Sequence, residues 1–220
     1  MRRFVITAAL AGALAIGTAA HARPFDQKTI AASAKWVLHV DVDAVGQSQV
    51  WKMAEPKLQN NPQFVKARKD IERIAQVRLP DDLHDITLYG PSFGEKEAVI
   101  VIRSAANDER LKTLISLNET YVSKTVGGQT VHSWEDKGKH LFAGFAADRR
   151  VVIGQSQDAV VGALDVLAGK MESIKSEVLV PNPQTAGVLM YIAGDEIARL
   201  AGSRGVTSPR SAVVQHLDNA

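Results

Sequence analysis

The chain has 220 residues, with 26 Lys and Arg, 24 Asp and Glu and no cysteine, and 45% of its residues are hydrophobic. This composition is typical of a soluble globular protein, and the lack of cysteine excludes disulfides, cysteine-bound zinc, iron–sulfur clusters and thiol catalysis. The formal charge of +2 comes from Arg2 and Arg3, because the rest of the chain has 24 basic and 24 acidic residues. We therefore expect no binding to nucleic acid.

The first 22 residues have the three-part pattern of a secretory signal peptide. Two arginines precede an uncharged apolar stretch at 4–17, and small residues follow at Ala20 and Ala22. The apolar stretch is about 14 residues long, which is short of the ~20 that span a bilayer. We expect cleavage between Ala22 and Arg23, export of the unfolded chain and a periplasmic or secreted location.

Arg2 and Arg3 also permit a twin-arginine signal, but the strongly apolar stretch that follows favours ordinary export. No later segment approaches ~18 consecutive apolar residues, so no membrane insertion is expected after cleavage.

The first predicted strand follows a lead-in segment at 23–33 and covers residues 36–42. Its residues alternate between apolar and more polar side chains, which is typical of a half-buried strand. We expect the core face to carry Trp36, Leu38, Val40 and Val42, and the other face to carry Val37, His39 and Asp41.

Helical segments are predicted next at 48–59 and 62–77, with Asn61 and Pro62 as the start signal of the second. The second segment has an apolar stripe that is expected to face the core: Phe64, Ala67, Ile71, Ile74 and Ala75. A short strand at 86–89 and a central, buried strand at 98–102 follow, and Asn107 begins a helix at 107–117.

The remaining elements of the domain are mostly strands joined by tight turns. A hairpin is predicted from 120–126 and 129–135 around Gly127 and Gly128, followed by strands at 140–146 and 150–154. Ser156 begins a helix that Gly169 ends. This order predicts an α+β fold with a mainly antiparallel sheet and helices packed on one of its faces.

The predicted organisation is an α+β domain at 34–170, a linker at 171–185, and a partial second repeat or C-terminal extension at 186–220. The last region has a strand pattern at 187–192 and a helix pattern at 195–201, which repeat the order of the elements at residue 36 onward. A further strand pattern at 212–217 follows.

Several segments resemble a family of uncharacterised exported bacterial proteins built from tandem α+β units. The segments are 34–43 (AKWVLHVDVD), 82–90 (DLHDITLYG), 132–134 (HSW) and 152–156 (VIGQS). The resemblance covers about residues 34–170, with a weaker match at 186–220. It implies export and this fold, and no activity or site residue.

A cluster of His39, Asp41 and Asp43 is the strongest candidate for chemistry. On one face of a strand these side chains would lie about 7 Å apart, and such groups can bind zinc or manganese. A solvated polar sheet face explains the same pattern. We find no motif for a catalytic site or a cofactor.

We therefore expect an exported, non-catalytic envelope protein that acts by binding or scaffolding, with an unidentified protein or envelope partner. The alternative is a metal-dependent or acid–base enzyme that uses His39, Asp41 and Asp43.

Overall fold

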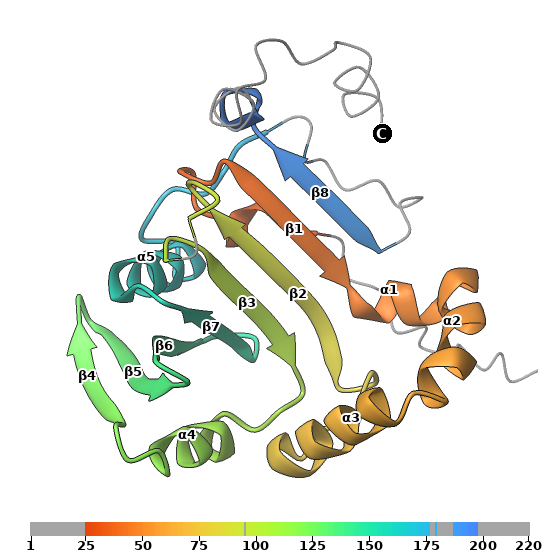
Figure 1. The fold of residues 1–220 in the computed structure, drawn as a ribbon. Coiled ribbons are helices and arrows are strands. Elements are labelled where there is room, and N and C mark those ends of the chain that lie inside the picture. The colour runs from red at the N-terminus through yellow and green to blue at the C-terminus, as the bar shows by residue number, and fades with distance from the viewer. Residues whose placement is uncertain (1–24, 95, 177–178, 180–186, 198–220) are drawn as a thin grey trace, which may run out of the picture.

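A computed structural model of the chain describes residues 25–94, 96–176, 179 and 187–197, which form one eight-stranded antiparallel sheet with helices (Figure 1). The expected α+β fold is confirmed. The order across the sheet is β4-β5-β6-β7-β3-β2-β1-β8. The strands are β1 (Trp36–Asp41), β2 (Leu83–Gly90), β3 (Val99–Ser104), β4 (Val122–Val126), β5 (Gln129–Asp136), β6 (Lys139–Ala146), β7 (Arg150–Gly154) and β8 (Val188–Ile192).

The helices begin where the sequence offers a side-chain cap. Asn61, Asn107 and Ser156 each accept a hydrogen bond from a backbone N–H of the following helix, as predicted. Asp41 does the same for a helix that was not predicted, α1. The helices are η1 (Gln27–Thr29, a 3-10 helix), α1 (Val42–Gln47), α2 (Gln49–Gln59), α3 (Pro62–Ala75), α4 (Asp108–Ser116) and α5 (Gln157–Leu167).

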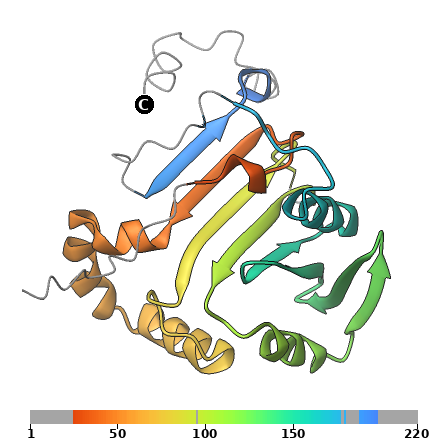
Figure 2. The same cartoon turned by 180° about the vertical axis from the view of Figure 1, so that it is seen from behind.

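One face of the sheet is covered by α5 and by residues 25–34, which contain the described part of the predicted lead-in. Figure 2 shows α5 and η1 in front of the strands on this side. The core lies between these layers: Ile30 of the lead-in and Val160 of α5 are fully buried with Val37, Val99 and Val152 of the strands. The lead-in is therefore part of the core.

The covered face of β1 is the opposite of the one predicted. Val37 is 0% and His39 6% exposed, whereas Trp36, Leu38 and Val40 are only half-buried on the other face. No described helix crosses β1, β2 or β3 on that other face, which Figure 1 shows. The prediction was wrong because the lead-in and α5 pack against the Val37 side.

The apolar stripe of α3 was also expected in the core, and it is not there. Ile71 and Ile74 are each 50% exposed. The helix lies along one end of the sheet with α2 and α4 as its neighbours, instead of across a sheet face (Figures 1 and 2). Its stripe therefore has no sheet surface to cover it.

The described part of the C-terminal region extends the same sheet. β8 pairs antiparallel with β1, from Trp36 opposite Ile192 to Val40 opposite Val188. The predicted linker also packs on the lead-in, because Gln27 Nε2 donates to the carbonyl oxygens of Ser176 and Leu179 at 3.0 and 3.1 Å. The predicted strand 212–217 and the cleavage site at Ala22 lie outside the described residues, so the second repeat stays a prediction.

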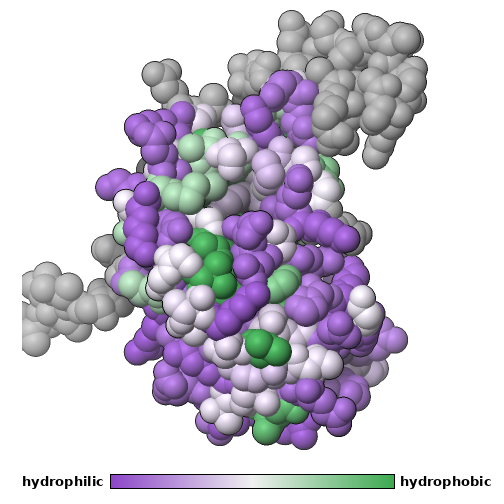
Figure 3. Space-filling model, turned by 90° about the vertical axis from the view of Figure 1, so that its left-hand side faces the viewer, coloured by the Kyte–Doolittle hydropathy of each residue, from purple (hydrophilic) through white to green (hydrophobic). Residues whose placement is uncertain are grey.

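The side of the molecule formed by β4 and α4 is mainly hydrophilic. Figure 3 shows its hydrophobic residues as separate small patches. Within the described ranges, no helix is both long and apolar enough to cross a bilayer.

Candidate binding cleft

A row of charged side chains crosses the covered face of the sheet beyond the end of the apolar core. The strand register places Asp41 opposite Asp85, Asp85 opposite Arg103, and Arg103 opposite Arg150. The next row towards the core contains His39, Thr87, Val101 and Val152. Neighbouring strands thus bring together residues that are far apart in the sequence.

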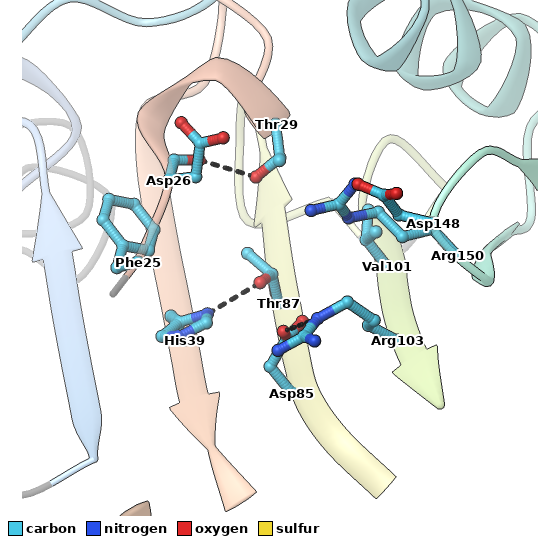
Figure 4. A pocket seen from close by; sticks show the side chains of 10 residues that line it. All are labelled: Phe25, Asp26, Thr29, His39, Asp85, Thr87, Val101, Arg103, Asp148 and Arg150. Carbon is cyan, nitrogen blue, oxygen red and sulfur yellow. Dashed lines mark hydrogen bonds and ion pairs between the residues drawn. The ribbon is translucent and has the colours of Figure 1, made fainter. Parts of the chain in front are cut away.

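These two rows form the floor of a cleft of about 440 Å³ between the lead-in and the turn before β7 (Figure 4). Asp26 and Thr29 lie on the lead-in side, and Asp148 and Arg150 lie on the β7 side. The lining residues are Phe25, Asp26, Thr29, His39, Asp85, Thr87, Val101, Arg103, Asp148 and Arg150.

Each arginine of the cleft forms an ion pair with an aspartate. Arg103 Nε donates to Asp85 Oδ2 at 2.6 Å, and Arg150 Nη1 donates to Asp148 Oδ2 at 3.2 Å. The first pair is well shielded, with side chains 12% and 16% exposed, and Arg150 is 18% exposed. Like charges directly opposite on neighbouring strands repel, so these acids offset the repulsion between the two arginines.

His39 closes the inner end of the cleft. Its Nδ1 shares a hydrogen bond with Thr87 Oγ1 at 2.8 Å, and the Phe25 ring packs edge-on against it at a centroid distance of 5.1 Å. Its Nε2 is buried and has no hydrogen-bond partner among the described residues. Burial lowers the pKa of His39, although the nearby carboxylates of Asp85 and Asp41 oppose this effect.

The three residues of the predicted cluster have separate partners. His39 contacts Thr87, the Asp41 carboxylate accepts the Ala44 N–H at 2.8 Å, and Asp43 Oδ2 lies 3.2 Å from His84 Nδ1. Asp43 belongs to α1 and not to the strand, because β1 ends at Asp41. Across the described part of the chain, no group of three or more His, Asp or Glu side chains could hold a metal ion.

Sequence reasoning identified His39 and missed the two arginines of the cleft. Arg103 directly follows the apolar run 99–102, and Arg150 directly precedes the apolar run 151–153. A charge at the end of a buried strand was the available signal. The strand register was needed to show that both arginines lie side by side.

The paired charges and the shielded imidazole are suited to holding a polar ligand in place. Each acid occupies one nitrogen of its guanidinium group, which leaves further N–H donors beside the cleft. His39 Nε2 is buried, so the imidazole is shielded at that nitrogen. The chain is thus an α+β protein with a charged cleft on the covered face of its sheet.

Comparison with known proteins found no matching family model and no matching curated protein. Among solved structures, crystal form III of TP0453 is similar with a TM-score of 0.46 and 13% identity over 80% of this chain and 66% of that one. Crystal form IV of TP0453 has a TM-score of 0.46 and 12% identity, over 78% of this chain and 65% of that one. This chain therefore spans just under two thirds of the length of TP0453. Such a weak likeness assigns no function, and the predicted family relationship stays a prediction.

Proposed function

We propose that this protein is exported to the periplasm or the exterior and acts there without catalysis, by binding a small polar ligand in the charged cleft. The observation that carries the proposal is the cleft of about 440 Å³, whose floor holds two ion-paired arginines. The pattern of the first 22 residues supports export.

The state of the ionisable groups supports binding over catalysis. A general acid or base must reach the proton that it transfers. The imidazole of His39 is instead packed against Phe25 with its Nε2 buried, and the charges of Arg103 and Arg150 are balanced by Asp85 and Asp148. Such groups are suited to orienting a ligand.

A fragment screen by NMR tests the proposal. The processed, ¹⁵N-labelled protein is mixed with small neutral and charged molecules, and we expect some of them to shift the amide signals of the cleft. Thr29→Trp places a large ring at the mouth of the cleft and is expected to abolish these shifts. Thr113→Trp, on the exposed side of α4, is the matched control. Shifts that persist in Thr29→Trp, or a screen without any cleft shifts, would refute binding at this place.

The alternative, a metal-dependent enzyme, has a separate test. Elemental analysis of the purified processed protein is expected to find no stoichiometric metal, and a chelator is expected to leave its melting temperature unchanged. Stoichiometric zinc or manganese that is lost in His39→Ala would reverse the proposal, because metal ligands must be retained for binding.

A further inference from the structure

We propose that the ligand of the cleft carries a single anionic group, a carboxylate or a phosphate, which is bound between the guanidinium groups of Arg103 and Arg150. This inference rests on the proposed function and adds the chemical class of the ligand.

The first reason is the position of the two arginines. Arg103 and Arg150 are directly opposite each other on β3 and β7, with their side chains on the same face of the sheet. Residues in this relation have Cβ atoms about 4.5–5.5 Å apart. Two guanidinium groups therefore lie on the floor of the cleft, where Figure 4 shows that of Arg103 beside Asp85 and that of Arg150 near Val101.

The second reason is that most of their donors are unused. A guanidinium group has five N–H donors. In the described part of the structure, Arg103 uses its Nε for Asp85 and Arg150 uses its Nη1 for Asp148, and neither side chain makes another hydrogen bond. These side chains are only 12% and 18% exposed, but their unpaired nitrogens are not among the buried polar atoms without a partner, so they remain accessible in the cleft. An anion would supply acceptors with the geometry that guanidinium groups favour.

The third reason is the negative charge of Asp26 on the lead-in side of the cleft, which limits the charge that a ligand can carry. Asp26 lies across the cleft from the arginines, and its Oδ1 accepts the Lys28 N–H at 3.0 Å. With Asp85 and Asp148, three carboxylates line the cleft beside two guanidinium groups. A ligand with one anionic group at the arginines avoids Asp26, whereas an extended polyanion would meet its repulsion.

Titration with inorganic phosphate and with acetate tests the inference. The full processed protein is followed by NMR at constant ionic strength, with chloride as the reference anion. We expect saturable shifts of the Arg103 and Arg150 side-chain N–H signals with at least one of the two anions. The anion that binds more tightly shows whether phosphate or carboxylate is preferred.

Two substitutions make the test specific. Arg150→Gln is expected to weaken anion binding about tenfold or more, because a charged hydrogen-bond donor is lost. Arg149→Gln removes the same charge from the exposed neighbouring position and is expected to leave the affinity unchanged. Arg150→Lys keeps the charge without the planar fork and is expected to bind with intermediate affinity. The amide spectrum of each variant shows whether it is folded.

The outcomes separate this inference from the proposed function. Shifts that do not saturate, or equal affinities in the wild type and Arg150→Gln, would overturn the anion site. If neutral fragments still bind in the cleft and Thr29→Trp blocks them, the binding function stands without the anion. If nothing binds in the cleft, both proposals fail.

Discussion

His39 is the residue whose environment departs most from its sequence pattern. It alternates with Val37 and Asp41 on a strand face that looked polar, and it is buried there beside Thr87. A buried imidazole needs a hydrogen-bond partner, because an unsatisfied polar group in the interior costs free energy. Thr87 provides that partner for Nδ1.

Replacing Thr87 by valine tests the importance of this hydrogen bond. Valine has nearly the shape of threonine but leaves Nδ1 of the buried imidazole unpaired, so we expect a loss of about 1–3 kcal/mol in the free energy of unfolding. Urea denaturation measures it. Thr125→Val, on exposed β4, is the control and should change stability by less than about 0.5 kcal/mol. Equal effects would show that the hydrogen bond contributes little.

The pH dependence of stability follows from the same burial. His132 of β5 is buried like His39, and burial is the main cause that lowers the pKa of both histidines. The folded protein therefore binds fewer protons than the unfolded chain below about pH 6.5. The free energy of unfolding should therefore be fully present above that pH and fall as the pH is lowered towards 5. His39→Asn, which keeps a polar group near Thr87 but does not titrate, should reduce this slope. An unchanged slope would contradict the assignment.

At the scale of elements, the packing of α5 on β6 depends on one small residue. A Cβ added at Gly144 would overlap Cδ1 of Leu164, a core residue of α5. The Gly144→Ala variant should therefore lose about 1–3 kcal/mol of stability through overpacking. Gly162, within α5, has open space around the added atom, and Gly162→Ala should gain about 0.5–1 kcal/mol from helix propensity. Thermal and urea unfolding compare the two, and a stable Gly144→Ala variant would show that Leu164 can move away.

One edge of β8 forms backbone hydrogen bonds with β1, and its other edge is the outer edge of the described sheet. Asp41 N–H donates to the Gly187 carbonyl, and Ala193 N–H donates to the Lys35 carbonyl. In an antiparallel pair such bonds recur at every second residue, so Leu189 and Tyr191 point their N–H groups at β1. The N–H groups of Val188, Met190 and Ile192 point to the outer edge, where no described strand pairs with them.

Amide hydrogen exchange tests the alternating direction of the N–H groups along β8. We expect slow exchange at the amides of Leu189 and Tyr191 and fast exchange at those of Met190 and Ile192. Slow exchange at all four would contradict an open edge and indicate a further strand there. Removing residues 212–217, which have a strand pattern, would then show whether that segment is the additional strand.

On the scale of the whole molecule, the first 22 residues and the cleft belong to one functional proposal, since a ligand-binding protein of the envelope must first be exported. Protein recovered from the periplasm or the medium should begin at Arg23 by N-terminal sequencing. Ala22→Trp should accumulate as the longer precursor, because signal cleavage requires small residues at this position. Retention of the wild-type chain in the cytoplasm with residues 1–22 attached would refute export.

The candidate site was predictable only in part. His39 was identified because a histidine within an alternating strand is conspicuous. Arg103 and Arg150 were missed because they are distant in the sequence and become neighbours only when β3 pairs with β7. Asp43 was placed on the strand because the alternation continues past Asp41, whereas the Asp41 side chain caps α1 and ends the strand pattern there.

The sequence by itself determined where most of the helices and strands lie, α1 and η1 excepted, because helix caps such as Asn61 and turn residues such as Gly127 act through their immediate neighbours. It also determined the antiparallel character of the sheet, since tight turns join most of the strands. Only the tertiary structure decided which face of β1 is buried. Both faces of β1 carry enough apolar side chains to be buried. The Val37 face is buried because the lead-in, which precedes β1, and α5, which is far from β1 in the sequence, both pack against it. That choice buries His39 and places the two arginines in one cleft.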